Sequence, residues 1–453
     1  MGCSASGQGG RENLQAIEAG LAPMWRVAPK NANGRVDWRM VRYLVHRYFM
    51  QTSSLLIRGL EPARQINESH AGTAEILRQR MPSLANMLEG KRDGLGFSLE
   101  DTAAVVAALD RVIADAESSL LEVAYKSQHR DPTRSLSHLE LTLIIETYMV
   151  HWILGDEDYV KKVVLKNPDS ISNYLPQWEA IREMAGGLVK TMEFSRARSP
   201  RVGQGMNSMT QRYSFTDAHE AVTSITKTFA SFWESECQHI KTSLMAMDRT
   251  GTGRVTLSDF YAAKAAGEWR FAESEQYLRD LGALDETSLN SKKLIIPNYL
   301  QGPNNCMITN EHYFVCCVSE CETVLADIET SVGSPVGAPA EILRALENFT
   351  SFDDEALRLA GMLTTQLERI AETHGGKVPL HGRLFAQWLH YAMPRECLFP
   401  HKAGTLSALP PDEFGNYRVS DSEVEIHAAT QGDLQELEEA QSMSQWSDEE
   451  ELI

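Results

Sequence analysis

Residues Asp248 to Asp259 form the stretch that most narrows what this chain can fold into. They read D-R-T-G-T-G-R-V-T-L-S-D. Side chains with oxygen atoms alternate with other residues, and Gly253 stands at the sixth position, where the backbone can turn sharply. The alternation aims successive oxygen atoms at one point. The pattern therefore predicts a tight loop that can surround a hard cation with oxygen.

Position in the loop assigns each oxygen donor. Side chains serve at positions one, three, five, nine and twelve, and a backbone carbonyl serves at position seven. The predicted ligands are Asp248, Thr250, Thr252, the Arg254 carbonyl, Thr256 and Asp259. Val255, at position eight, is the apolar residue expected where two such loops form a short β-bridge. A second loop is therefore expected beside this one.

Both flanks of the loop have helical periodicity. Upstream, apolar side chains recur at three- and four-residue steps from Phe229 to Met247. Downstream, Phe260 opens an alanine-rich segment that Gly267 could end. Loop and flanks together resemble an EF-hand. The resemblance implies a helix-loop-helix unit that binds Ca²⁺, with Mg²⁺ in competition, and whose two helices reorient when the ion binds.

Departures from the usual EF-hand loop favour weak binding. Position three is Thr250, where Asp, Asn or Ser is usual, and position twelve is Asp259 in place of the longer Glu. Arg249 and Arg254 offset the two carboxylates, so the loop has no net formal charge. We therefore expect an affinity well below that of a cytosolic calcium buffer. The alternative is a helix-loop-helix that keeps its shape without an ion.

Weaker copies of this turn-and-helix pattern recur along the chain. Each has a turn, a short extended pair with one apolar residue, and an amphipathic segment, and they lie at residues 33–38, 96–99, 135–138 and 375–380. Their ligand positions are mostly empty, so they are either degenerate hands kept for packing or generic helix-loop-helix patterns. Leu294 to Ile296 is an apolar extended run. We expect it beside Arg254 to Thr256 as the second strand of the bridge.

The net charge of the chain limits the kinds of partner that it can bind. The 453 residues carry a net charge of -19, and this acidic balance argues against nucleic-acid binding, which needs clustered Lys and Arg. From Asp412 onward the chain has thirteen acidic residues and a single Arg, so this tail is predicted to be solvated and disordered. No apolar run reaches the roughly eighteen residues of a membrane-spanning helix.

Shifts in composition predict the domain order. Residues 195–213 hold four Arg, no acid and two Gly, which is typical of an exposed basic linker. The predicted order is an anchor segment at 1–24, a helical region with degenerate hands at 25–194, the linker at 195–213, an EF-hand-containing helical region at 214–402, and an acidic disordered tail at 403–453.

The N-terminus reads M-G-C-S-A-S, a pattern that favours lipid attachment. Gly2 and Ser6 match N-myristoylation, and Cys3 is placed for palmitoylation. Two acyl chains anchor a protein stably, whereas one does so only marginally. The pattern predicts attachment to a membrane surface at its cytoplasmic face, or a location in the cytoplasm.

Most of the seven cysteines lie in the C-terminal half. The candidate cluster comprises Cys306, Cys316, Cys317, Cys321 and Cys397. In a cytoplasmic protein such thiols stay reduced, so we expect buried cysteines that pack as small apolar side chains. The alternatives are disulfides in an oxidising compartment and a zinc site, although no paired C-x-x-C motif supports zinc.

Two stretches near the end of the helical region carry a second resemblance. Residues 378–390 read V-P-L-H-G-R-L-F-A-Q-W-L-H, and residues 394–401 read P-R-E-C-L-F-P-H. Both are similar to an uncharacterised family of EF-hand proteins in single-celled algae such as dinoflagellates. The similarity implies an EF-hand type of protein with no known activity and, for exported members, a disulfide-bonded cysteine cluster.

The sequence holds no phosphate-binding loop, kinase motif, dinucleotide fingerprint or nucleophile elbow. His381, His390 and Cys397 are the residue types of a thiol hydrolase, but spacing does not show the pairing that such chemistry needs. We thus expect a mainly α, non-enzymatic, membrane-tethered calcium sensor or adaptor for an unidentified protein target. The alternatives are an ion-independent helical scaffold and a Cys/His metal or redox module.

Overall fold

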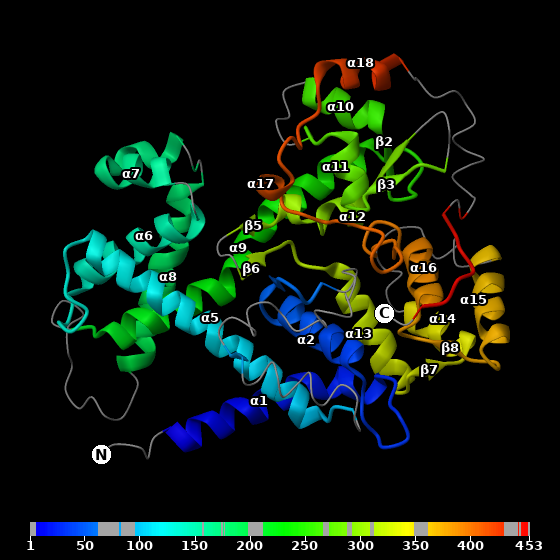
Figure 1. Cartoon of the computed structure of the whole chain (residues 1–453), viewed down its shortest axis with the longest axis horizontal. Coiled ribbons are helices and arrows are strands. Elements are labelled where there is room, and N and C mark those ends of the chain that lie inside the picture. Colours follow the sequence, from blue (N-terminus) through cyan, green and yellow to red (C-terminus); the bar gives the residue numbers. More distant parts are fainter. Residues whose placement is uncertain are drawn as a thin grey trace. The chain divides into compact units, whose positions relative to one another are not determined.

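The computed structural model describes residues 6–61, 81–82, 96–155, 158–173, 175, 177–197, 212–265, 271–287, 292–308, 312–347, 361–429, 443 and 445–451. Within these residues the chain forms sixteen α-helices, whereas its strands are only two or three residues long (Figure 1). The prediction of a mainly α fold is confirmed. No helix in this part of the chain is both long and apolar enough to cross a membrane.

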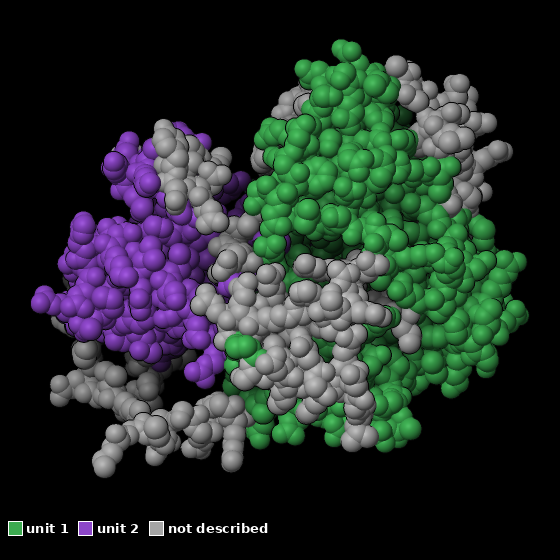
Figure 2. Space-filling model, viewed as in Figure 1, with its two compact units in different colours: residues 1–107, 235–306, 316–453 green, residues 108–234, 307–315 purple. Residues whose placement is uncertain are grey.

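Packing divides the chain into two compact units, which Figure 2 draws in different colours. The first unit comprises residues 1–107, 235–306 and 316–453, and the second comprises residues 108–234 and 307–315. Two long helices, α5 (Leu99–Ser127) and α9 (Phe215–Met247), contribute residues to both units. The division therefore falls inside helices.

The first unit contains the elements on either side of the predicted cation loop. Its other helices are α1 (Ser6–Val27), α2 (Trp38–Ser53), α10 (Leu257–Ala265), α11 (Glu275–Asp280), α12 (Ile296–Leu300), α13 (Glu320–Val332), α14 (Pro339–Glu347), α15 (Met362–Thr373), α16 (Arg383–Ala392), α17 (Pro411–Phe414) and α18 (Asp421–Ala429). Its strands are β1 (Leu55–Ile57), β2 (Arg254–Thr256), β3 (Leu284–Asp285), β4 (Lys293–Ile295), β7 (Val336–Gly337) and β8 (Val378–Pro379), and a short 3₁₀ helix spans Pro303–Asn305. The second unit adds α6 (His138–Ile153), a 3₁₀ helix at Pro168–Asn173, α7 (Asp158–Lys166), α8 (Trp178–Ala197), β5 (Met307–Ile308) and β6 (Tyr313–Val315).

Short antiparallel bridges join loops of this chain two by two. Four of the antiparallel pairings in the described part of the chain join Val36 to Phe97, Leu136 to Tyr213, Val255 to Leu294, and Gly337 to Val378. We call these the bridged pairs and name each by its facing residues. The Val255–Leu294 pair has the partner strand that the sequence predicted, because β2 lies antiparallel to β4.

Apart from Phe97, each bridging residue lies in the loop of a helix-loop-helix. A helix begins within a few residues after every one of them: α2, α5, α6, α9, α10, α12, α14 and α16. A helix also precedes each bridging residue except Phe97, whose preceding residues 83–95 lie outside the described part. Two helices are shared, since α5 leaves the Phe97 loop and enters the Leu136 loop, and α9 connects the Tyr213 and Val255 loops in the same way.

The residue after the bridge often starts the helix through a capping box. At α6, the Glu140 amide donates to the Ser137 hydroxyl, and the Ser137 amide donates to the Glu140 carboxylate over 2.8 Å. The same reciprocal bonds join Ser98 to Asp101 and Ser214 to Asp217. These bonds satisfy amides that the first turn of a helix leaves unpaired.

The Val255–Leu294 pair has its own apolar core. Leu244 of α9, Phe260 of α10 and Tyr299 of α12 are at most 1% exposed and belong to one cluster with the two bridging residues. The Gly337–Val378 pair has a separate core, in which Ile328, Leu367 and Trp388 are fully buried. These two bridged pairs therefore have separate apolar cores.

The segment predicted to be a disordered tail is folded where the structure describes it. Val419 is buried in the core of the Val255–Leu294 pair, and Phe414, Tyr417 and Val424 pack against that core. The Val419 amide donates to the Ala272 carbonyl over 2.8 Å. The prediction of disorder is wrong here, because these spaced apolar residues bury enough surface to order an otherwise acidic segment.

The last described residues dock against the other core of the first unit. Trp446 packs on the core of the Gly337–Val378 pair. Ser447 and Gln387 exchange two hydrogen bonds, of 2.9 and 3.0 Å, between α16 and the returning chain. The Arg383 amide donates to the Glu451 carbonyl over 2.8 Å. Residues 445–451 are thus an integral part of this pair.

The segment assigned to an anchor also contributes a packed helix. α1 begins at Ser6, and its residues Ile17, Leu21 and Met24 are at most 3% exposed. Gly2 and Cys3 lie outside the described residues, so acylation stays a prediction.

Candidate cation-binding loop at residues 248–259

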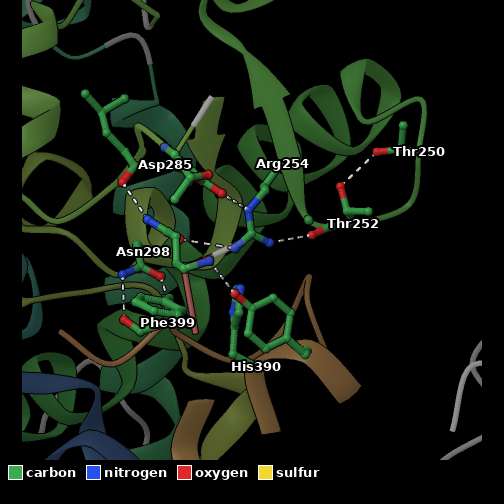
Figure 3. A network of polar contacts seen from close by, with 12 residues as sticks. Thr250, Thr252, Arg254, Asp285, Asn298, His390 and Phe399 are labelled. Carbon is green, nitrogen blue, oxygen red and sulfur yellow. Dashed lines mark hydrogen bonds and ion pairs between the residues drawn. The ribbon is translucent and has the colours of Figure 1, made fainter. Parts of the chain in front are cut away.

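The first half of the loop gathers oxygen atoms around Asp248. Its carboxylate accepts hydrogen bonds from the amides of Thr252, over 3.1 Å, and Gly253, over 2.9 Å. The Thr250 hydroxyl lies 3.4 Å from Asp248 Oδ1. It also lies 2.8 Å from the Thr252 hydroxyl, as Figure 3 shows. Positions one, three and five of the predicted ligand set therefore converge.

The second half of the loop uses its carboxylate to start a helix. The Thr256 hydroxyl donates to Asp259 Oδ2 over 3.0 Å and accepts from the Asp259 amide, which is capping geometry for α10. Arg249 Nη2 lies 2.9 Å from Asp259 Oδ1 on the exposed side. Positions nine and twelve are thus close together, but the position-twelve carboxylate already has two partners.

The Arg254 side chain, unlike its carbonyl, has a structural role that the sequence did not reveal. Its Nε lies 2.8 Å from Asp285 Oδ2, and both side chains are buried. Its Nη1 donates to the Thr252 carbonyl and its Nη2 to Gln445 of the returning chain (Figure 3). Burial alone would raise the pKa of Asp285, but the Arg254 charge and bonds from Thr287 hold that pKa below its usual range. The pair fixes the base of the loop.

The turn that contains Pro394 and Arg395 packs closely against the loop. Gly253 has φ +69°, and a Cβ on it would overlap the carbonyl of Pro394. The next residue, Arg395, places its Nε 3.1 Å from Asp248 Oδ2, although the Asp248 side chain is fully shielded from solvent. The glycine is therefore needed both for the turn and for this close approach.

The donor chemistry of the loop fits a hard cation. All six predicted donors carry oxygen, and the Thr250 hydroxyl lies within hydrogen-bonding distance of both the Asp248 carboxylate and the Thr252 hydroxyl. Only two of them are carboxylates, each with an arginine beside it. Among the described residues, no group of three or more His, Cys, Asp or Glu is arranged to hold a metal ion.

The candidate cysteine cluster is oxidised. Three disulfides join Cys237 to Cys317, Cys306 to Cys316, and Cys321 to Cys397. The prediction that these thiols stay reduced is wrong, because folding brings Cys237 of α9 against Cys317 and Cys397 against Cys321 of α13. The expected burial is found for Cys316, Cys317 and Cys397. Cys237 lay outside the predicted cluster, since 80 residues separate it from its partner. In small secreted domains a native disulfide stabilises by about 2–5 kcal/mol.

Each of the two histidines near this cluster has a hydrogen-bond or ion-pair partner other than a thiol. His390 is fully buried, its Nδ1 lies 2.7 Å from the Cys397 carbonyl, and burial lowers its pKa to about 3, so it is neutral. His381 lies 2.8 Å from Glu329, which also pairs with Arg47. Neither histidine faces a free Cys397 thiol, because that sulfur is bonded to Cys321.

Sequence reasoning missed parts of this arrangement. The loops at Tyr213 and Gly337 were not recognised as repeats, yet both form bridges. An available signal was the acidic residue four positions after the bridging residue. Asp217 and Glu341 each accept a hydrogen bond from the backbone amide of the residue that follows the bridging residue. No local signal marked Arg395, whose partner Asp248 lies 147 residues away.

Comparison with known proteins found no relatives. No family model, no curated protein and no solved structure matches this chain. The similarity of residues 378–401 to an algal EF-hand family therefore stays an inference from the sequence.

Proposed function

We propose that the chain is an EF-hand-type protein built from four bridged pairs, seven of whose loops are structural. The bridging residues face each other in every pair, and helices flank each loop except the Phe97 loop, whose preceding residues lie outside the described part. The remaining loop, residues 248–259, binds one Ca²⁺ ion weakly, and Mg²⁺ competes for the same oxygen atoms.

The convergence of oxygen atoms at positions one, three and five carries this proposal. Asp248 is held by two loop amides, so its carboxylate is oriented before any ion arrives. Thr250 and Thr252 add hydroxyl oxygens, and the Arg254 carbonyl, Thr256 and Asp259 complete the set. Asp259 must separate from Arg249 to coordinate the ion, and this cost lowers the affinity of the loop for Ca²⁺.

The disulfides favour a setting for such a weak site. Disulfides persist in oxidising compartments, and EF-hands that work outside cells bind calcium at about 10⁻⁴–10⁻³ M. The three disulfide bonds therefore favour a protein of the secretory route or the cell exterior. The cytoplasmic location and membrane attachment predicted from the N-terminus, and the protein target, stay predictions.

Calorimetry tests the calcium site. Isothermal titration of the oxidised chain with millimolar CaCl₂ should show one weak site, and Asp248→Asn should abolish the heat because it removes the charge while keeping the size. Far-UV circular dichroism of the variant controls for folding. An unchanged heat in a folded Asp248→Asn chain would place the binding elsewhere.

A second candidate is an ion-independent scaffold. It is favoured by the arginine partners of Asp248 and Asp259, which satisfy both carboxylates without a metal. In that case a tryptophan emission spectrum and dye binding to exposed apolar surface stay the same with and without millimolar Ca²⁺. A calcium-dependent change in either favours the sensor.

A further inference from the structure

We propose that Arg395 is a built-in competitor for the cation at Asp248 and sets the calcium affinity of the loop. The inference rests on the proposed calcium site at residues 248–259. Arg395 Nε lies 3.1 Å from Asp248 Oδ2, so a guanidinium already supplies positive charge to the first carboxylate of the loop. A charge-assisted bond of this kind is among the stronger hydrogen bonds in proteins.

The turn that carries Arg395 is fixed from two further directions. Cys397 is bonded to Cys321 of α13, and the Cys397 amide closes the turn on the Met393 carbonyl over 2.9 Å. Glu396 Oε1 lies 3.5 Å from Lys241 Nζ of α9. Arg395 is therefore held near its carboxylate as an intramolecular partner with a high effective concentration.

The same turn fits the loop closely. The Pro394 carbonyl lies where a Cβ of Gly253 would stand, so the glycine admits the turn against the sixth position. The other two arginines of the loop do not serve in this way, because Arg249 pairs with Asp259 and Arg254 pairs with Asp285. Arg395 is the cation that faces the Asp248 carboxylate across the interface of loop and turn.

Competition follows from electrostatics. A divalent ion within coordination distance of Asp248 would stand beside the guanidinium, and like charges at such a separation repel strongly where water is excluded. The ion must therefore displace Arg395 from the carboxylate. The measured calcium affinity is therefore the intrinsic affinity of the oxygen ligands multiplied by the fraction of molecules in which Asp248 is not paired with Arg395.

The direct test compares calcium affinity in two arginine variants. Arg395→Gln removes the competing charge and should tighten Ca²⁺ binding about tenfold, the equivalent of losing one charge-assisted bond. Arg130→Gln is the control for net charge, because Arg130 forms an exposed ion pair with Glu140 in the Leu136 loop and has no contact with Asp248 among the ion pairs of the described residues. It should leave calcium affinity unchanged, so a nonspecific effect of net charge is excluded.

A second measurement uses the unaltered chain. Amide hydrogen exchange of residues 393–397, followed by mass spectrometry, should speed up when calcium binds, since the turn loses its contact with Asp248. This readout does not depend on how well a variant folds. Calcium-induced slowing, or no change while calcium is bound, overturns the displacement.

The outcomes separate the inference from the calcium site itself. Tighter binding by Arg395→Gln than by the parent supports the inference, and so does binding by the variant alone. Equal calcium affinity in the parent and Arg395→Gln overturns the role of Arg395 and leaves the site standing. No calcium binding by either chain overturns both.

Discussion

The loop at residues 248–259 and the loop at residues 129–140 share most of their construction. Each carries a bridging residue at position eight, Val255 or Leu136, followed by a hydroxyl residue that starts a helix. Each has an arginine at position two that pairs with the acid at position twelve, with nitrogen–oxygen distances of 2.9 and 3.0 Å. This half of the pattern is therefore helix-starting chemistry and does not by itself indicate an ion.

Positions one and six separate the two loops. Position one is Asp248 in one loop and His129 in the other, and position six is Gly253 in one and Arg134 in the other. In the first loop the position-one carboxylate accepts the amides of positions five and six, whereas in the second loop the Asp131 carboxylate at position three accepts the amide of position five. We therefore expect the proposed cation binding to depend on Asp248 far more than on Asp259.

Position six should show the largest contrast. Gly253→Ala adds a Cβ at positive φ and against the Pro394 carbonyl, so we expect about 4 kcal/mol of lost stability. Arg134→Ala, at the matched exposed position, should change stability by less than about 0.5 kcal/mol. Urea unfolding of both oxidised variants measures the contrast. Equal stability would mean that the turn at Pro394 does not fit the loop as described.

The Val255–Leu294 pair also carries a carboxyl whose charge should oppose folding at high pH. Glu273 is fully buried, its oxygens accept from the Tyr299 hydroxyl and the Ala272 amide, and burial raises its pKa to about 7 from 4.5. Because the folded pKa is the higher one, the native state holds a proton that the unfolded chain releases. Stability is therefore lost as pH rises from about 4.5 to about 7.

Glu273→Gln should remove this loss. At pH 8 the variant should be more stable than the parent by roughly 3 kcal/mol, and near pH 4 the two should converge. Thermal unfolding midpoints across this pH range measure the difference. A constant difference at all pH values would show that Glu273 does not titrate in the native state.

Position one should give the next contrast. Asp248→Ala leaves the amides of Thr252 and Gly253 without their acceptor and Arg395 without its partner, at a cost of about 2 kcal/mol. His129→Asn should cost nothing measurable, because His129 is exposed with φ +52° and Asn adopts that conformation readily. Denaturant midpoints compare the two variants without calcium present.

Position twelve should show no contrast at all. Asp259→Ala and Glu140→Ala each remove an acid from the start of a helix, and each should cost about 1 kcal/mol. The surface ion pairs with Arg249 and Arg130 add little to either value. A cost much larger at Asp259 than at Glu140 would show that the two loops are less alike than their hydrogen bonds suggest.

Local pattern in the sequence was enough to predict the helix-loop-helix around Gly253 and its partner strand. Glycine at the turn, an apolar residue at position eight and helical periodicity on both sides are short-range signals, and β2 pairs with β4 as expected. The same signals found the loops at Val36, Phe97 and Leu136 as weak repeats. Tyr213 was missed because residues 195–213 were interpreted as a basic linker, and Gly337 was missed because a glycine stands where the pattern has an apolar residue.

Long-range contacts could not be predicted in this way. The approach of Arg395 to Asp248 and of Cys397 to Cys321 depends on how separate bridged pairs pack. The tail was misjudged for a related reason: its charge was visible in the sequence, whereas the apolar core that receives Val419 was not. The composition of a segment therefore does not predict its burial, which depends on whether the rest of the chain provides an apolar core for it to pack against.

Equilibrium dialysis with ⁴⁵Ca²⁺ tests the central claim that only one of these loops retains a cation. The oxidised full chain should retain about one ion per molecule at millimolar calcium, and Asp248→Asn should retain none. Retention of several ions, no retention by the parent, or equal retention by Asp248→Asn would contradict the account.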